Sequence, residues 1–490
     1  MKHDRIRRLA ACLCLCALLW SGMTVPAQAA GFTDISAEHW AAEAVSRCVS
    51  QGWLRGQSTE TFGVGQPMTR GAFAVALSRF FGWESTEAPY QIFTDVPEDA
   101  WYEQALRACY EHGAVTRQTA EFRPGDAITR EELAVMLVRA LGYSAVAGLL
   151  GEDDLPFTDV TTNRGYITLA YEMGLVNGMS GTRFAPDRAA TREQAAVMLS
   201  RLYDRLHPAA QETVAILRTG EELPDFTGCT AVVLMAGTLS SGQEVRFNAN
   251  GGAEERAQAA EAARAAGCKV LMDVAGQAAS LKAGASGAVP LVRAMNDGGY
   301  DGIYLDITLR EWSDSGRLAL LAQAIRNAVP HGLLYAEADA PVRGKTDPDY
   351  TALGKAVDRI VLRVDACVDT GAAVSAMEPP ESICYGLNVL NDQVPASKLS
   401  LLLTTTAQAR KGKQRFSAVD GETLSALAEA GTAYYSDRYA CAYLETEDTV
   451  AWYLDGRALA ARRQLLNCYG AESLCLSGLN GTLTLTDAPA

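Results

Sequence analysis

A short motif that occurs three times in the first half of the chain constrains the fold most. Phe-Thr-Asp followed by an aliphatic residue begins at positions 32, 93 and 157. A helical run that ends at a glycine follows each copy, and then a Thr-Arg pair in which the threonine can cap a second helix. The first helical runs are Ala41–Gln51, Tyr102–His112 and Ile167–Met173. Two helices per unit, three times at a spacing near 60 residues, predict a small all-α repeat array over residues 32–206.

This pattern resembles the S-layer homology (SLH) domain, in three copies. The shared features are the Phe-x-Asp start, Trp40 and Trp101, the Phe-x-Pro segments at 122–124 and 184–186, and the Thr-Arg turn. The resemblance implies three repeats packed as a pseudo-threefold prism, whose grooves bind secondary cell-wall polysaccharide, often pyruvylated. The third copy has no tryptophan after its Phe-Thr-Asp, which puts one groove in question.

The resemblance also implies which side chains bind the polysaccharide. They are Arg70, Arg130, Arg192, Trp40 and Trp101. A guanidinium can make two hydrogen bonds to a carboxylate such as that of a pyruvyl ketal, and aromatic faces suit sugar rings. The alternative is that the three arginines only cap helices or form pairs within the prism.

The segment after His207-Pro208 alternates strand-like and helical runs, which predicts βα units. Its length fits a (β/α)8 or TIM barrel, which typically has ~250 residues. The expected strands are Val214–Leu217, Ala231–Met235, Lys269–Val274, Gly302–Ile307, Leu333–Ala336, Arg359–Val364, Leu399–Thr404 and Ser473–Leu476. Clear helices are expected at Ala253–Ala266 and Gly316–Val329. The chain is therefore predicted to be multidomain, with an all-α prism followed by an α/β barrel.

The fourth of these strands carries the residues on which the function depends. Alternation places Tyr304, Asp306 and Thr308 on one face, and a polar inward face at the end of a parallel strand is where such barrels keep their active sites. The run from Asp301 to Thr308 resembles the signature of the glycoside hydrolase family 18 (chitinase-like) barrels, Asp-Gly-x-Asp-x-Asp-x-Glu. Asp301, Gly302 and Asp306 match it. Tyr304 replaces the middle aspartate, and Thr308 replaces the glutamate that serves the family as general acid.

The resemblance therefore implies a barrel that keeps the scaffold and has lost the acid. General acid catalysis contributes typically ~10²–10⁴-fold, and a threonine hydroxyl cannot replace the acid near neutral pH. Glu337 and Asp365 follow the fifth and sixth strands and are the carboxylates that could substitute. Together with Tyr304 and Asp306, they are also the candidates for binding a glycan.

Composition bounds the remaining possibilities. With 43 basic and 58 acidic residues the formal net charge is −15, which argues against nucleic acid as a partner. The five histidines are scattered, so we expect no dedicated metal site and no cofactor. Residues 1–29 are typical of a secretory signal peptide with the cleavage site Ala27-Gln28-Ala29, and no later stretch is long and apolar enough to span a membrane. The nine cysteines of the mature chain are dispersed, and most are expected to be buried apolar residues.

These observations predict a secreted protein of the cell wall and S-layer. The expected domains are repeats at 30–90, 91–154 and 155–208, and a barrel at 209–490. The barrel is expected to bind or present a glycan after losing catalysis. Two alternatives stay open, an active hydrolase of cell-wall or N-acetylglucosamine-containing polysaccharide and a purely structural S-layer component.

Overall fold

The protein is described by a computed structural model that divides into two compact units. The described residues are 31–85, 90–150, 155–218, 221, 223–239, 245–247, 252–278, 281–282, 284–309, 314–341, 348–364 and 377–479, so the expected signal peptide lies outside them. The first unit comprises Met1–Gly142, Pro156–Asn163 and Leu175–Leu202. The second comprises Tyr143–Leu155, Arg164–Gly174 and Tyr203–Ala490.

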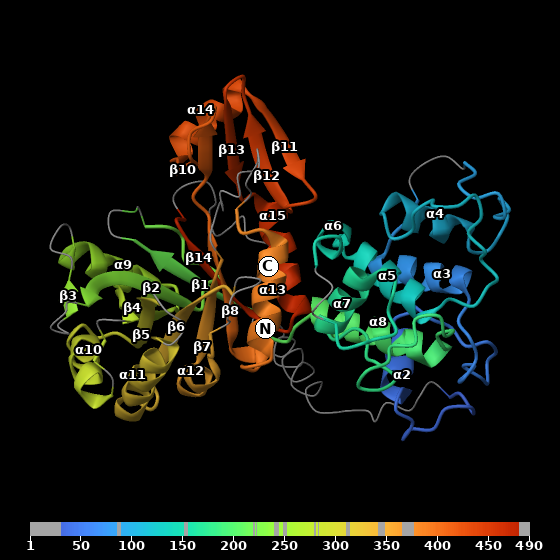
Figure 1. Ribbon diagram of the computed structural model, residues 1–490, viewed down its shortest axis with the longest axis horizontal. Coiled ribbons are helices and arrows are strands. Elements are labelled where there is room, and N and C mark those ends of the chain that lie inside the picture. Colours follow the sequence, from blue (N-terminus) through green and yellow to red (C-terminus); the bar gives the residue numbers. More distant parts are fainter. Residues whose placement is uncertain are drawn as a thin grey trace, which may run out of the picture. The chain divides into compact units, whose positions relative to one another are not determined.

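The first unit is built from the predicted helical repeats. Its described helices are α2 Ala42–Ser50, α3 Arg70–Phe81, α4 Glu103–Glu111, α5 Arg130–Ala140 and α8 Arg192–Leu206, which continues into the second unit (Figure 1). Thr69 and Thr129 cap α3 and α5, as the Thr-Arg pairs predict, by accepting hydrogen bonds from Ala72 N at 3.2 Å and Glu132 N at 3.1 Å. The predicted all-α array is confirmed.

A ring of three backbone hydrogen bonds joins the repeats about a pseudo-threefold axis. Ile128 donates to Met68, Met68 donates to Ala190, and Ala190 donates to Ile128, at 2.8, 2.9 and 2.9 Å. All three residues are buried. Each of them stands just before a Thr-Arg pair, so each repeat contributes one donor and one acceptor. The third repeat therefore pairs with the first, and the array closes on itself.

The aspartate of each Phe-Thr-Asp motif fixes the segment that leads to this ring. Asp34 accepts hydrogen bonds from the backbone of Phe62, Gly63 and Val64 at 2.8, 2.7 and 3.0 Å. Asp159 does the same for Phe184 and Ala185 at 2.8 and 2.9 Å. Although burial works in the opposite direction, these bonds lower the pKa of both carboxyls. The motif recurs because a carboxylate is needed there to hold the backbone.

The second unit contains a closed barrel of eight parallel strands. In barrel order they are β1 Glu212–Leu217, β2 Ala231–Leu239, β4 Lys269–Gln277, β5 Gly302–Thr308, β6 Leu333–Asp339, β7 Arg359–Arg363, β8 Leu399–Thr404 and β14 Ser473–Ser477. The parallel pairings of β1 with both β2 and β14 close the barrel, and β3 Val245–Phe247 adds an antiparallel strand to β2. The eight predicted strands and the predicted fold class are confirmed.

Helices surround this barrel as βα units require (Figure 1). They are α9 Ala253–Ala265, α10 Ala285–Asp297, α11 Ser315–Ala328, α12 Thr351–Ala356, α13 Pro380–Asn391 and α15 Gly456–Cys468, with a 3-10 turn at Ala396–Lys398. Apolar side chains fill the interior, including Val214, Val233, Leu271 and Val361. Two tyrosines, Tyr304 and Tyr335, join this core, so the inward face of the strands becomes polar towards their carboxyl ends.

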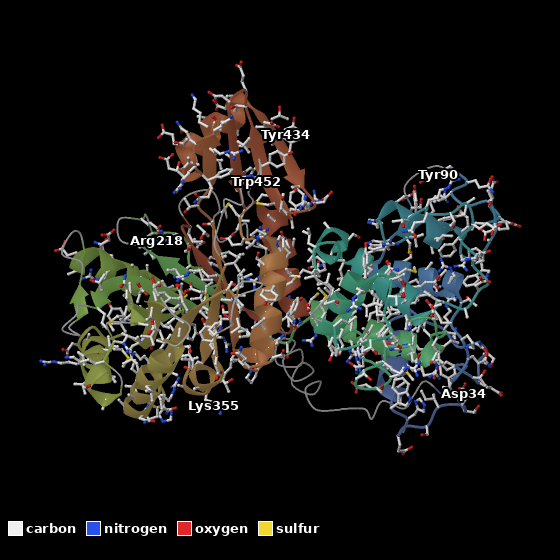
Figure 2. All side chains as sticks on the ribbon, in the orientation of Figure 1. Asp34, Tyr90, Arg218, Lys355, Tyr434 and Trp452 are labelled. Carbon is white, nitrogen blue, oxygen red and sulfur yellow. The ribbon has the colours of Figure 1, made fainter. Side chains whose placement is uncertain are left out.

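A second, antiparallel sheet is inserted between β8 and α15. Its strands are β9 Gln408–Lys411, β10 Ser417–Ala418, β11 Thr432–Ser436, β12 Cys441–Glu445 and β13 Thr449–Tyr453, and α14 Gly421–Ala430 packs on one face through Leu424. Tyr434, Tyr443 and Trp452 are register partners on three neighbouring strands of the opposite face, and Tyr434 and Trp452 are labelled in Figure 2. Because the insertion follows the carboxyl end of β8, it stands at the end of the barrel where the mouth lies.

Two short helices ahead of β1 also belong to the second unit. They are α6 Ser144–Ala147 and α7 Arg164–Glu172. Glu172 accepts a hydrogen bond of 2.6 Å from the buried hydroxyl of Tyr469, which directly follows α15. In the part of the chain that the structure describes, eight cysteines are free and buried. No helix there is both long and apolar enough to cross a lipid bilayer.

Candidate functional site

The three Thr-Arg arginines join neighbouring repeats. Each guanidinium donates through Nε to the carbonyl oxygen of a phenylalanine in the next repeat, at 2.8 to 2.9 Å, and lies 4.6 to 4.9 Å from the centre of that ring. The pairs are Arg70 with Phe122, Arg130 with Phe184, and Arg192 with Phe62. These contacts order the guanidinium groups. They are contacts within the prism, as expected if the arginines have a structural role instead of binding polysaccharide. Arg130 is buried and Arg192 is partly exposed.

The two tryptophans expected to bind sugar are among the most exposed aromatic residues. Trp40 is 63% exposed and Trp101 is 69% exposed. In the third repeat the equivalent position, eight residues after the Phe-Thr-Asp phenylalanine, is Gly165. A Cβ atom there would lie 1.8 Å from the carbonyl oxygen of Ala147 in α6. A tryptophan at this position would therefore collide with α6.

One groove of the first unit brings charged groups of two repeats together. It has a volume of about 200 Å³ and its lining includes Arg70, Arg123, Glu132 and Arg139. Glu132 forms ion pairs with Arg70 and, at 3.2 Å, with Arg123. Arg123 is more exposed than Glu132, with 55% of its side chain accessible to solvent. Glu132 therefore balances part of the positive charge that these arginines bring to the groove.

In the barrel, four inward-facing carboxyl and guanidinium groups meet at the carboxyl ends of β5, β6 and β7. Arg363 Nη1 lies 3.2 Å from Asp306 Oδ1 and 2.5 Å from Glu337 Oε2. Its Nη2 contacts Asp339 at 2.5 Å. The hydroxyl of Tyr304 donates to the other oxygen of Glu337 at 2.8 Å. Sequence reasoning selected Tyr304, Asp306 and Glu337, and the structure brings these three together.

Asp273 on β4 extends this cluster inwards. It is two residues beyond the core residue Leu271, so it has the same inward orientation, and it is in register with Tyr304. Only 2% of the residue is exposed, and its Oδ1 has no hydrogen-bond partner among the described residues. We call Asp273, Asp306, Glu337, Asp339 and Arg363 the mouth cluster.

Burial and mutual repulsion shift the protonation of the mouth cluster. Burial, and then the charges of Asp306 and Glu337, raise the pKa of Asp273 well above its ordinary value. Burial and the carboxylate of Asp306 raise the pKa of Glu337 to about 7, although Arg363 and Tyr304 favour its ionised form. The cluster therefore holds protons at neutral pH that isolated carboxyls would have released.

The remaining residues of the motif lie elsewhere. Asp301 is at the opposite end of β5, where it accepts from Val270 N at 2.9 Å and pairs with Lys269 at 3.2 Å. Thr308 ends β5 and is exposed, and Asp365 lies outside the described residues. Among those residues no group of three His, Cys, Asp or Glu side chains could hold a metal ion.

Sequence reasoning missed Asp273, Asp339 and Arg363. The missed signal for Asp273 was its spacing of two residues from Leu271 on a predicted parallel strand, which gives both the same orientation. Arg363 stands two residues after the core residue Val361 in the same way. A charged residue that faces inwards near the carboxyl end of a barrel strand is expected to lie at the mouth of the barrel.

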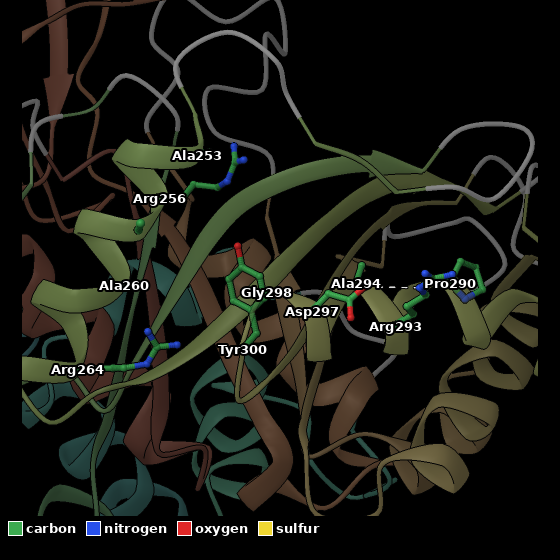
Figure 3. A pocket seen from close by; sticks show the side chains of 11 residues that line it. Ala253, Arg256, Ala260, Arg264, Pro290, Arg293, Ala294, Asp297, Gly298 and Tyr300 are labelled. Atoms are coloured by element: carbon green, nitrogen blue, oxygen red, sulfur yellow. Dashed lines mark ion pairs between the residues drawn. The ribbon is translucent and has the colours of Figure 1, made fainter.

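A groove in the barrel wall is separate from the mouth. It lies between α9 and α10, has a volume of about 630 Å³, and Figure 3 shows Arg256, Arg264, Arg293 and Tyr300 lining it. Arg264 donates to the backbone of Gly299 at 2.7 Å, and Arg293 pairs with a neighbouring aspartate on α10 at 3.5 Å. These cations are engaged by their own chain, and the groove contains none of the residues that the strand motif selects.

Comparison with known families identifies the repeats. The S-layer homology domain model matches residues 31–74, 92–134 and 156–196, so the chain carries three S-layer homology domains. Similar proteins include an endoglucanase from Bacillus sp. (strain KSM-635), 30% identical over 216 residues, which are 43% of this chain and 22% of that protein. The surface-layer 125 kDa protein of Lysinibacillus sphaericus is 31% identical over 216 residues, 42% of this chain and 18% of that protein. The match thus spans less than a quarter of either relative.

Solved structures similar to this chain include enzymes with chitinase-like barrels. The spore cortex-lytic enzyme SleL of Bacillus megaterium QM B1551 is 13% identical, over 66% of this chain and 80% of that one, with a TM-score of 0.47. A GH18 chitinase from Cycas revoluta, solved with (GlcNAc)3, is 15% identical over 54% of this chain and 94% of that one, also at 0.47. At these scores the likeness carries no argument about activity, and the barrel is established by its own strand pairing.

Proposed function

We propose that this protein is anchored in the cell wall by its three S-layer homology domains and binds a glycan in the mouth of a barrel that has lost hydrolysis. The domains indicate a protein of the cell surface, and the match to a surface-layer protein agrees with association to the S-layer. Their ligand in this proposal is secondary cell-wall polysaccharide. Trp40 and Trp101 offer exposed aromatic faces to its sugar rings, and the partly exposed arginines of the grooves offer charge.

The anchoring can be tested on the exposed tryptophans. The Trp40→Ala, Trp101→Ala double variant of the mature chain should lose most of its sedimentation with purified sacculi that keep their polysaccharide. Both side chains are more than 60% exposed, so folding should be unaffected. Trp83→Ala is a matched control, because Trp83 stacks on its neighbours Phe81 and His112. Equal sedimentation of the double variant and the wild type would contradict the role of the tryptophans, and sedimentation with stripped sacculi would contradict the polysaccharide as ligand.

Arg363 is the single observation that carries the loss of hydrolysis. Substrate-assisted cleavage needs a protonated acid at the position of Thr308 and a neighbouring aspartate that is free to orient the N-acetyl group. Thr308 has no carboxyl group, and the carboxylate of Asp306 is engaged by Arg363 at 3.2 Å. The polar, partly exposed ends of Asp306, Asp339 and Arg363 still offer acceptors and donors to a bound sugar.

A second candidate function is hydrolysis with Glu337 as the acid. The specific observation in its favour is the convergence of Glu337 and Asp306 on one guanidinium, with the pKa of Glu337 raised to about 7, where a general acid is most effective. Against it, Glu337 is almost completely buried and already holds both Tyr304 and Arg363. The third alternative is a structural S-layer component, and a purely structural role does not explain the buried charged groups of the mouth.

A further inference from the structure

The mouth cluster has more carboxyl groups than cations to balance them. Three carboxyls, those of Asp306, Glu337 and Asp339, contact one guanidinium, that of Arg363. The carboxyl of Asp273 is a fourth, close enough for the charges of Asp306 and Glu337 to act on it. A second cation, Arg218, directly follows β1, and its charge acts on Asp273. With Arg218 counted, four carboxyl groups face two cations, so carboxyl groups outnumber cations in the described part of the mouth. An excess of groups that can carry one sign of charge attracts ligands of the opposite sign.

Asp273 supplies an independent sign that a ligand is missing. Buried polar atoms are nearly always hydrogen-bonded, and an unsatisfied one costs free energy that another contact must offset. Oδ1 of Asp273 is without a partner in a residue that is only 2% exposed. The residue faces the barrel interior beside Asp306 and Glu337, whose charges act on it most strongly. A donor that enters between these carboxyls would satisfy it.

We propose that the mouth binds a glucosamine unit with a free, protonated amine in preference to an N-acetylated one. This inference rests on the proposed glycan-binding function and names the class of sugar. An ammonium group brings three N–H donors and a positive charge, which match acceptors that outnumber their donors. Asp306 and Asp339 have 27% and 30% of their side chains exposed, so both can reach a sugar in the mouth.

An acetamide fits the same place less well. It carries one N–H donor, no charge and a carbonyl oxygen, which is one more acceptor among acceptors. Its N–H would have to compete with Arg363 for Asp306. Leaving such a group next to buried carboxylates without hydrogen bonds is unfavourable, because each unpaired polar atom keeps its desolvation cost. The N-acetyl group that other chitinase-like barrels need would therefore be disfavoured here.

Calorimetric titration of the full mature chain tests this directly. Glucosamine oligomers and N-acetylglucosamine oligomers of equal length are the two ligands, at low and at high salt. We expect the free-amine oligomer to bind about tenfold more tightly, since a charge-assisted hydrogen bond is worth roughly that factor. High salt should reduce this difference. Asp306→Asn and Asp339→Asn should each weaken the free-amine oligomer several-fold and leave the acetylated one little changed.

Glu261→Gln is the matched control, because it removes the same charge from an exposed position on α9. It should bind both oligomers as the wild type does. Equal or tighter binding of the acetylated oligomer would overturn this inference while glycan binding stands. Binding of neither oligomer would overturn the proposed function itself. If Glu261→Gln and Asp306→Asn lost the same affinity for the free-amine oligomer, the net charge of the protein would explain the effect. That result would also overturn the assignment to the mouth.

Discussion

Arg363 determines how the barrel mouth can be used, because a single guanidinium contacts three carboxylates. Removing one partner of a buried ion pair is costly, whereas the intact group is close to neutral in its effect on stability. The arginine therefore keeps Glu337 and Asp306 in the folded protein, and at the same time it occupies the oxygen atoms that hydrolysis would need. A binding site tolerates this arrangement better than a catalytic site does.

A second buried carboxyl gives the stability of the protein a defined pH dependence. Glu378 is 1% exposed, accepts from Thr404 N at 3.0 Å and has no described partner for its Oε2. Burial raises its pKa from 4.5 to about 7, although Arg462 opposes this. The folded protein thus binds more protons than the unfolded chain between these values, so the free energy of unfolding should fall as pH rises from about 4.5 to 7.

The Glu378→Gln variant isolates this effect. Its free energy of unfolding should lack a pH-dependent loss of roughly 2–4 kcal/mol that the wild type shows over this window, at about 1.4 kcal/mol for each unit of pKa shift. Carboxyls with lowered pKa values, such as Asp34 and Glu212, are ionised in both states above pH 5 and do not contribute. Urea unfolding at pH 5.0 and 7.5 measures the difference. If the free energy of unfolding changed by the same amount in the wild type and in the variant between these two pH values, the assignment to Glu378 would be contradicted.

At the scale of the element, the Phe-Thr-Asp aspartate and the Phe-x-Pro segment act together. The middle residue of that segment has a left-handed backbone, with φ of 59° at Arg123 and 60° at Ala185, and so does Gly63 at the same place in the first repeat, with φ of 91° in Phe62-Gly63-Val64. Two of these are not glycine, and such a residue is strained by about 1 kcal/mol. The carboxylate compensates by accepting the N–H of the strained residue itself.

Asp159→Ala should therefore destabilise the first unit by about 2–4 kcal/mol, because it leaves two backbone donors without an acceptor next to the buried Phe184. Asp159→Asn keeps one acceptor and should lose less. Asp187→Ala, an exposed position in the same segment, is the control and should stay within about 0.5 kcal/mol of the wild type. Urea midpoints compare the three. Equal losses for positions 159 and 187 would show that the aspartate does not hold the segment.

The regular elements could be predicted because, within each helix or strand, the apolar residues recur at one regular spacing. The barrel strands are short apolar runs such as Leu399–Thr404, and helix α3 begins at the capping residue Thr69 and ends at Gly82. The inserted sheet escaped prediction because its strands are short and two of them are largely exposed, so their sequences show little alternation between buried and exposed residues. β10 has only 2 residues, and the first three residues of β11 are exposed. Alternation placed Asp306 inwards, but the partnership with Arg363 depends on the stagger of neighbouring strands.

At the scale of the whole molecule, the third repeat differs from the other two. Its tryptophan position is Gly165, packed against α6, and its first helix α7 belongs to the same compact unit as the barrel. The S-layer homology match at 156–196 therefore runs through both units. The expected boundary at residue 208 stays a prediction. The anchoring proposed here relies on the two repeats that keep their tryptophans.

The barrel is proposed to hold a glycan without cleaving it, and analysis of the products can test this. The full mature chain is incubated with N-acetylglucosamine oligomers and with glucosamine oligomers across pH 4.5 to 8, and the products are identified by mass spectrometry. We expect both sets to be recovered at their original length, because Thr308 cannot act as the acid and Arg363 engages Asp306. Shorter oligomers that persist in Thr308→Ala but disappear in Glu337→Gln would contradict this proposal, and would make Glu337 the acid of an active hydrolase.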